Sequence, residues 1–244
     1  MLLSLALVAS CSGPASRGTS IHVNAKDLAE EVTIRRQTYL VEKAIQDVII
    51  AYEMEDLDVD VIIEEEGGLG ETRPELNLDL GVHGGRVTIN KLLFLEDNPA
   101  KAQILLGLFA HELAHALHYS ALSRRDLLLL GVRYERFYLN PQGPLAGWAR
   151  AYEQFTDMTA IAHGFGDALV EQKKRSKENI STRHPAKVWE FYLEPEEIRN
   201  LMNDTDALEA RIRSALEEIG LASLDQFGEG LIAIRRAQVP IDTQ

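Results

Sequence analysis

The spacing of apolar residues in the first part of the chain predicts two kinds of element. Between residues 25 and 55, apolar side chains recur at near-helical spacing among charged ones, which predicts one long helix or two joined helices. Acidic and apolar residues then alternate over residues 57–63, the pattern of a half-buried strand. The alternation recurs over residues 75–82 and 86–90, and residues 83–85 (His-Gly-Gly) indicate a tight turn between them. We therefore expect a small antiparallel sheet that contains a hairpin.

After residue 98 the pattern becomes mainly helical. Asn98 and Pro99 are typical of a helix cap and a first helical residue, and apolar residues continue at helical spacing to about residue 122. Residues 173–184 are polar and basic, and we expect a loop there. Further helices are predicted over residues 127–137, 145–163 and 205–219, with another that begins near residue 194. The expected fold class is α+β, with the small sheet followed by a mostly helical C-terminal part.

The composition is that of a globular protein. The chain has 244 residues, of which 45% are hydrophobic and 26% are charged, enough for one large domain with a substantial core. Its formal net charge of −13 disfavours a nucleic-acid partner, because phosphate binding needs a basic surface. No apolar run reaches the roughly eighteen residues of an ordinary membrane-spanning helix, so none is expected.

The N-terminal segment is typical of an export signal. Residues 2–9 are apolar, and small residues then lead to Cys11, the single cysteine of the chain. This arrangement resembles a bacterial lipoprotein signal, in which Cys11 would be lipidated and would anchor the protein on the cell envelope, at the periplasmic face or the cell surface. We therefore divide the chain into a signal and flexible linker, residues 1–20, and a single domain, residues 21–244. If the segment is not a signal, the protein is intracellular.

The strongest chemical signal lies in the helix that is predicted after residue 98. The run His111-Glu112-Leu113-Ala114-His115 places two imidazoles at positions i and i+4, on one face of a helix, where they can share a metal ion. Glu112 can take a proton from a metal-bound water. The surrounding residues are almost all apolar, so burial of this polar group without a partner would be costly. We therefore expect a bound metal ion, with Zn²⁺ favoured.

A catalytic zinc site needs a third protein ligand, and Glu153 is the best candidate. Glu153 and Asp157 lie at i and i+4 of a predicted helix whose other residues are mostly apolar or small. One carboxylate can therefore bind the metal while the other orients a ligating histidine. Glu135 is a competitor, but Leu139 rather than an acid stands four positions after it. We favour Glu153.

The motif and the second acidic helix together resemble a known group of enzymes. HExxH followed by ExxxD resembles the pattern of the gluzincin metallopeptidases, over about residues 85–165. Within them the chain is most similar to soluble relatives of the CaaX-prenyl-protease and heat-shock membrane-peptidase family, although it lacks that family's spanning helices. The resemblance implies a zincin-like domain. It also implies a set of site residues: the zinc ligands His111, His115 and Glu153, the general base Glu112, and the orienting carboxylate Asp157.

Other histidines and tyrosines are weaker candidates for site residues. His184 precedes a proline and resembles the family's downstream His-Pro element, which would stabilise the oxyanion as it forms; Tyr152 and Tyr138 are alternatives. His118 shares a helix face with the motif, but three ligands spread over two turns cannot easily gather around one ion. We expect His118 behind the metal ligands, at the cleft rim or on the surface. His163 is expected at a helix C-terminus and not at the metal.

These patterns predict a zinc-dependent endopeptidase that hydrolyses peptide bonds with a metal-activated water and Glu112 as general base. Residues 86–90 would lie along the cleft and pair with an extended protein or peptide substrate. No nucleic-acid partner is expected, and membrane contact is expected only through the lipid anchor at Cys11. Two alternatives stay open: a non-catalytic zinc-binding lipoprotein that acts as an assembly or binding module, and an intracellular regulatory metallopeptidase.

Overall fold

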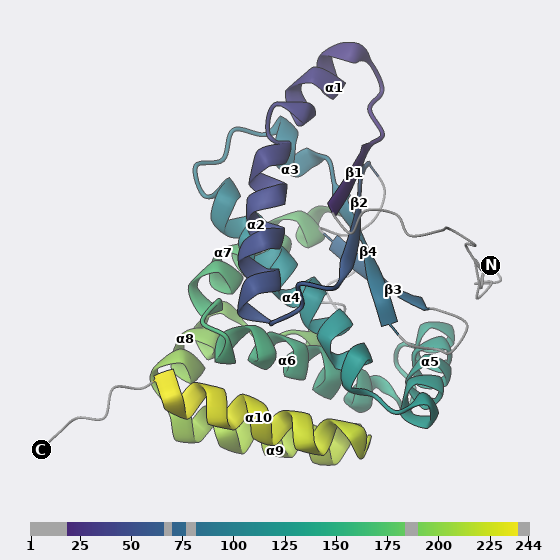
Figure 1. The fold of residues 1–244 in the computed structure, drawn as a ribbon, viewed down its shortest axis with the longest axis vertical. Coiled ribbons are helices and arrows are strands. Elements are labelled where there is room, and N and C mark those ends of the chain that lie inside the picture. The colour runs from purple at the N-terminus through teal and green to yellow at the C-terminus, as the bar shows by residue number, and fades with distance from the viewer. Residues whose placement is uncertain (1–18, 66–69, 77–81, 184–189, 239–244) are drawn as a thin grey trace, which may run out of the picture.

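The computed structural model describes most of the chain (Figure 1). The described residues are 19–65, 70–76, 82–183 and 190–238. Cys11 and His184 lie outside them, so the lipid anchor and the oxyanion donor stay predictions. The first strand begins at Thr19, two residues before the expected start of the domain at residue 21.

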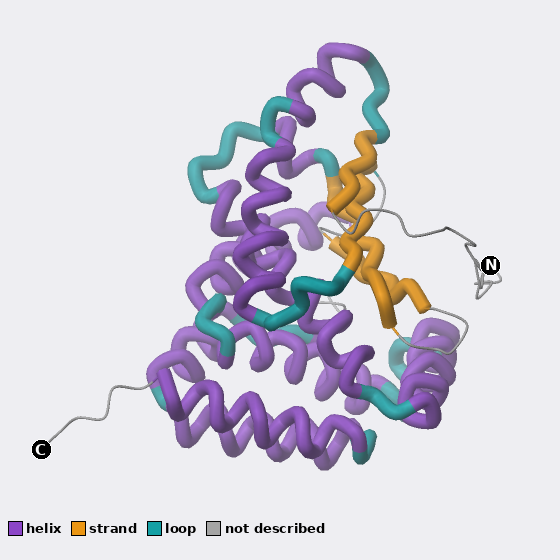
Figure 2. Tube along the Cα trace, viewed as in Figure 1, coloured by secondary structure: helices purple, strands orange, loops and turns teal. Residues whose placement is uncertain are grey.

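Helices make up most of the described chain, and the strands gather on one side of the molecule (Figure 2). One cluster of buried apolar residues extends from Ile34 near the N-terminus to Ile232 in the last helix. The expected α+β class with a mostly helical C-terminal part is therefore confirmed. No helix in the described ranges is both long enough and apolar enough to cross a membrane.

The sheet has four strands in the spatial order β1–β2–β4–β3. The neighbours β1 and β2 are parallel, as are β2 and β4, and only β3 runs antiparallel to its neighbour β4. The expectation of an antiparallel sheet is therefore wrong. An antiparallel pair does exist, but it is formed by β3 and β4 and not by the expected strands 75–82 and 86–90. The bounds of the strands are Thr19–Val23 (β1), Asp58–Glu64 (β2), Gly70–Leu76 (β3) and Val82–Asn90 (β4).

The parallel pairing follows from the connection between β1 and β2. This connection contains two joined helices, α1 (Leu28–Arg35) and α2 (Thr38–Ala51). A helical crossover returns the chain so that the next strand runs in the same direction as the first. The alternation of apolar residues shows that a segment is a strand, but it carries no information on the direction of its neighbour.

Residues 83–85 do not form the expected turn, because they lie inside β4. Gly84 and Gly85 each pair with β2 on one side and with β3 on the other. A Cβ on Gly85 would lie 3.9 Å from the Cβ of Ala116, so the sheet passes close to the next long helix at this point. The two glycines therefore mark an approach between backbone and helix rather than a chain reversal.

The position of β4 also corrects the expected role of residues 86–90. Because β4 is paired on both sides, its backbone groups are not available to an added peptide strand. The two strands at the edges of the sheet are β1 and β3, and β3 contacts the long helix that carries the HExxH motif.

That helix, α4 (Lys101–Ala121), runs through the interior of the protein. It follows a short helix, α3 (Leu92–Leu95), and begins two residues later than expected. The Asn98 side chain accepts a hydrogen bond from the backbone N–H of Ala100 at 2.8 Å, just before the helix. All residues from 107 to 116 are buried. The helix packs against α2 and the sheet, and against two later helices. The HExxH motif is therefore part of the core.

Six helices follow α4, and the last two pack together at the opposite end of the molecule from α1 (Figure 1). The expected helix over residues 205–219 is confirmed, whereas the expected loop over residues 173–184 is wrong. The last helix was not expected from the pattern. The bounds are Arg124–Leu139 (α5), Ala146–Ala162 (α6), Gly166–Arg183 (α7), Pro195–Asn203 (α8), Thr205–Ile219 (α9) and Ser223–Gln238 (α10).

Because α7 is rich in polar residues, its sequence pattern did not predict a helix. Several of its polar side chains face the interior: Gln172 and Ser176 are buried and share a hydrogen bond of 2.9 Å, and Lys173 is only 1% exposed. An amphipathic pattern marks a helix only when its buried face is apolar. Here the buried face includes polar groups, of which Gln172 and Ser176 pair within α7 and Lys173 pairs with Asp157 on α6.

We expect Gly107→Ala to destabilise the protein, because α4 and α7 approach each other most closely there. A Cβ at this position would fall on the backbone of Ala168 and within 2.8 Å of the backbone nitrogen of Leu169. Backbone atoms cannot move aside as a side chain can, so we expect a loss of about 1–3 kcal/mol in the free energy of unfolding. Gly131→Ala in α5 is the matched control.

A Cβ on Gly131 meets no atom within 4 Å. The better helix propensity of alanine should therefore stabilise this variant by up to about 1 kcal/mol. Urea unfolding measures both changes. A midpoint for Gly107→Ala at or above that of the wild type would contradict the close approach of α4 and α7.

Candidate metal centre

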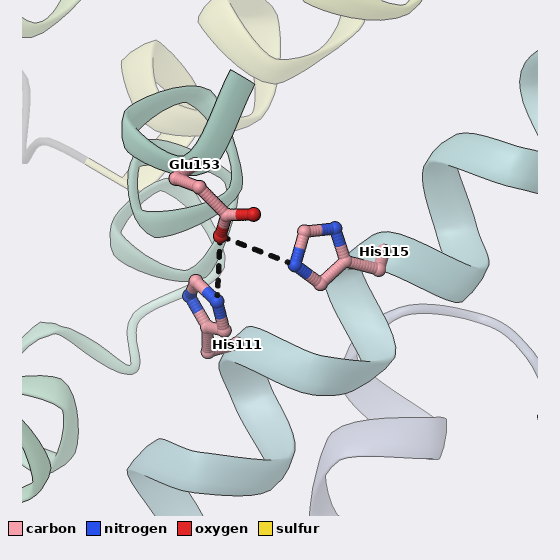
Figure 3. A group of neighbouring side chains, drawn as sticks. All are labelled: His111, His115 and Glu153. Carbon is pink, nitrogen blue, oxygen red and sulfur yellow. Dashed lines mark ion pairs between the residues drawn. The ribbon is translucent and has the colours of Figure 1, made fainter. Parts of the chain in front are cut away.

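His111 and His115 of α4 converge with Glu153 of α6 (Figure 3). The Oε2 atom of Glu153 lies 3.3 Å from Nε2 of His111 and 3.4 Å from Nε2 of His115. One ligand atom from each side chain lies within 4.8 Å of the other two. Both histidines are buried, and Glu153 is partly buried. The three side chains form a group that could hold a metal ion.

The helices themselves produce this geometry. The two imidazoles come from successive turns of α4, with ring centroids 5.0 Å apart and planes at 89°. The helix α6 packs against α4 and brings Glu153 to the Nε2 atoms of both rings (Figure 3). Two imidazole nitrogens and one carboxylate oxygen are a donor set that suits divalent transition metals, with a coordination position left for water.

Asp157 holds His111 from the other side of the ring. Its Oδ1 atom accepts hydrogen bonds from Nδ1 of His111, at 2.7 Å, and from Nζ of Lys173, at 2.8 Å. Its Oδ2 atom accepts one from the backbone N–H of Leu193, at 3.0 Å. A carboxylate on Nδ1 sets the tautomer and leaves Nε2 directed at Glu153. The expected role of Asp157 as an orienting group agrees with this geometry.

His115 is held by packing. Its ring stacks against Tyr119, with centroids 6.2 Å apart, and against Tyr152, with centroids 5.6 Å apart. The hydroxyl of Thr156 donates to the backbone carbonyl of Tyr152 at 3.0 Å, and its oxygen lies 3.4 Å from Nδ1 of His115. That distance corresponds to a weak hydrogen bond at most. The two histidines are therefore oriented by different means.

The second oxygen of Glu153 is held by α5. The hydroxyl of Tyr134 donates to Oε1 of Glu153 at 2.8 Å, while Oε2 faces the two histidines. Tyr134 was not among the residues that the sequence indicated, although it adjoins the rejected candidate Glu135. This hydrogen bond fixes the orientation of the carboxylate relative to the two histidines.

The charges of the group are tightly coupled. Burial and Lys173 both disfavour a charged His111, yet Asp157 and Glu153 outweigh them and raise its pKa from the ordinary 6.5 to about 9. Burial raises the pKa of Glu153, but His115 and His111 outweigh burial and hold it well below the ordinary range. Burial likewise opposes the charge on Asp157, while Lys173 and His111 lower its pKa overall. A metal ion must therefore displace the proton on His111.

Glu112 differs from the other two acids of the centre. Its side chain is buried, at 6% exposure, one residue after His111. Within the described part of the chain no hydrogen bond or ion pair engages its carboxylate, whereas Glu153 and Asp157 have at least three such contacts each. The role of Glu112 as general base stays a prediction.

None of the alternative candidates belongs to the metal-capable group. Glu135 is exposed on α5 and is not part of the metal-capable group, so the structure favours Glu153. Tyr138 is 61% exposed on the same helix. The hydroxyl of Tyr152 is enclosed and has no hydrogen-bond partner in the described ranges, so it faces no substrate.

The side chains of His118 and His163 each pack against an aromatic ring. His118 is fully buried, which rules out the cleft rim and the surface among its expected positions and leaves a position behind the metal ligands. Its Nε2 lies 2.9 Å from Oγ1 of Thr159, its ring stacks on Phe155 at 4.8 Å, and burial lowers its pKa well below the ordinary value. His163 ends α6, as expected, and packs against Tyr52 with centroids 4.6 Å apart. Neither belongs to the metal-capable group.

Two further residues of the centre were missed, and no local pattern identifies them. The Nζ atom of Lys173 lies over the ring of Tyr192, 4.2 Å from its centroid, in addition to its ion pair with Asp157. The ring of Tyr192 lies 5.7 Å from that of His111. Both residues are distant in sequence from the HExxH motif. The i, i+4 spacing that identifies His111 and Glu153 therefore gives no information about them.

Comparisons of the chain with protein-family models, with curated proteins and with solved structures gave no match.

We expect Asp157→Asn to weaken metal binding. The variant keeps the shape of the side chain but loses the charge that Oδ1 presents to His111 and Lys173. Loss of a carboxylate behind a ligating histidine typically lowers metal affinity by about 10–100-fold. Competition with a chromophoric chelator measures the Kd for Zn²⁺.

Asp126→Asn is the matched control for Asp157→Asn. Asp126 is also buried, at 9% exposure, and accepts hydrogen bonds from the backbone and the hydroxyl of Ser223 at 3.1 and 2.6 Å. Its loss should lower stability without a change in the Kd for Zn²⁺. Equal Zn²⁺ affinity in Asp157→Asn and the wild type would contradict the role of Asp157.

The raised pKa of His111 predicts a pH dependence of stability in the metal-free protein. A folded-state pKa above the unfolded value stabilises the fold fully below about pH 6.5, and this contribution is lost as the pH rises to about 9. At about 1.4 kcal/mol per pKa unit the loss is about 3 kcal/mol. Urea unfolding in chelator at several pH values measures it. The slope should vanish in His111→Gln, and a wild-type stability that stays constant over this window would refute the assignment.

Proposed function

We propose that the protein is a zinc-dependent endopeptidase of gluzincin type. The observation that carries this proposal is the convergence of His111, His115 and Glu153 beside a buried, uncommitted Glu112. The donor set of two imidazoles and one carboxylate is the one that catalytic zinc sites use, with a position left for water. A site that only binds metal has no use for an adjacent free carboxylate, whereas hydrolysis needs a general base there.

In this mechanism each residue has a distinct task. Zn²⁺ held by the two histidines and Glu153 would lower the pKa of a water ligand and polarise a peptide carbonyl. Glu112 takes a proton from the attacking water and returns it to the amine as the peptide C–N bond breaks. Asp157 keeps the Nε2 atom of His111 directed at the centre. His184 stays the predicted donor to the oxyanion.

The edge strand β3 is the place where an extended substrate would pair. It has a neighbour only on the β4 side in the described sheet, and it contacts α4, which carries the motif. An extended peptide can add to such an edge through backbone hydrogen bonds. This assignment replaces β4, whose backbone is paired on both sides. The substrate is a protein or peptide in extended form.

The predicted lipid anchor at Cys11 completes the proposal. It would place the peptidase on the cell envelope, at the periplasmic face or the cell surface. An intracellular regulatory metallopeptidase is the alternative if residues 1–20 are not a signal. Incorporation of radiolabelled palmitate into the wild type but not into Cys11→Ser distinguishes the two.

Glu112→Gln tests the catalytic role directly. The variant keeps the size of the side chain and removes the base, so we expect hydrolysis of fluorescein-labelled casein to fall at least about 100-fold while zinc content is unchanged. Glu135→Gln is the matched control, because Glu135 is exposed on α5 and should leave both activity and zinc unchanged. Glu153→Gln should lose zinc together with activity.

The outcomes separate the proposal from a structural metal site. If Glu112→Gln keeps full, chelator-sensitive activity, the general-base mechanism is wrong. If the zinc-loaded wild type hydrolyses no denatured protein, and removal of zinc only lowers its stability, the protein is a non-catalytic zinc-binding module. The hydrogen bonds that tie Asp157 to α4, to α7 and to Leu193 make such a stabilising role physically reasonable.

A further inference from the structure

The outer face of α5 concentrates the exposed apolar residues of the protein. Of the ten large apolar side chains that are exposed in the described ranges, four belong to this one helix. They are Leu128 (60% exposed), Val132 (46%), Tyr138 (61%) and Leu139 (80%). Single exposed apolar residues are normal on a protein surface, but a cluster on one helix marks an interaction site. The helix lies at the periphery of the molecule (Figure 1).

Three of these residues lie along one side of α5 and form an apolar stripe. At about 100° per residue, Leu128, Val132 and Leu139 point within about 40° of one another around the axis. Arg124 lies on one side of the stripe, and Arg125 and Arg136 lie on the other, all of them exposed. The single exposed acid of the helix is Glu135.

The charge of α5 is opposite to that of the chain. The helix has four arginines and two acids, so its formal charge is 4 − 2 = +2, whereas the chain has −13. None of the three arginines beside the stripe makes an ion pair within the described ranges. An apolar stripe flanked by arginines, with a tyrosine near one end, is the arrangement of helices that lie in the interface of an anionic membrane.

We propose that α5 docks the protein onto an anionic lipid surface. The stripe would enter the headgroup region, while the long stems of Arg124, Arg125 and Arg136 would place their guanidinium groups at the lipid phosphates. This contact adds to the one that is expected from the lipid anchor at Cys11. An acidic protein needs such a local basic face, because its overall charge repels the same membrane.

The opposite face of α5 connects this surface to the metal centre. There the hydroxyl of Tyr134 donates to Glu153, and the ring of Phe137 packs against Phe191 with centroids 5.1 Å apart. The metal-capable group is therefore about one helix diameter, roughly 10 Å, from the docking face. If the protein is the proposed peptidase, its substrates are extended segments close to a membrane surface.

A fluorescent probe on the stripe tests the docking. Cys11→Ser removes the only cysteine and any acyl anchor, so Leu128→Cys can be labelled alone with an environment-sensitive nitrobenzoxadiazole dye in the full chain. Vesicles that contain phosphatidylglycerol should shift its emission to the blue and raise it several-fold. Vesicles of pure phosphatidylcholine should have little effect. Ile50→Cys on α2 is the matched control, because Ile50 is 56% exposed, close to the 60% of Leu128.

Each outcome decides the proposal. A response at position 128 and none at position 50, reduced by Val132→Asp with Leu139→Asp and by charge reversal of the three arginines, supports docking through α5. No response at position 128, or equal responses at both positions, overturns it. A response that depends on protein concentration without vesicles indicates a second copy of the chain and also overturns it. None of these readouts involves hydrolysis, so they are independent of the proposed peptidase activity.

Discussion

The carboxylate of Asp157 is the constraint on which the arrangement of the metal centre depends. It is fully buried, and a buried charge is tolerated only when it is paired and hydrogen-bonded. Its partners come from three different segments: His111 on α4, Lys173 on α7 and the backbone N–H of Leu193. The need to satisfy one interior carboxylate therefore brings these segments together around α6 and sets the orientation of a candidate metal-ligating histidine.

The same need explains why α7 has a polar interior face. Lys173 of α7 pairs through the core with Asp157 of α6, which also holds His111 of α4, and α7 packs closely against α4. Gly107 permits this approach, because α4 has no side chain where the backbone of Ala168 passes. The close backbone contact between α4 and α7 and the ion pair between Lys173 and Asp157 are therefore parts of the same packing arrangement. A change in the distance between α4 and α7 would move the support of His111.

The helix α5 has two faces with different physical tasks. Inward, Tyr134 completes the hydrogen bonds of Glu153, so the third candidate ligand depends on the position of α5. Outward, the exposed Leu128 and Leu139 lie beside arginines on a chain that is otherwise acidic.

The sequence alone determined what lies within one or two turns of a helix or along one strand. This includes the pairs His111/His115 and Glu153/Asp157, the alternation of partly buried and buried residues along β2, and the existence of most helices. Only the tertiary structure decided that the sheet is mostly parallel, that β3 and not β4 is an edge, and that Lys173 is buried. Periodicity reports which face of an element is apolar. It cannot report which buried polar groups pair across tens of residues, because those pairings are set by how the helices pack.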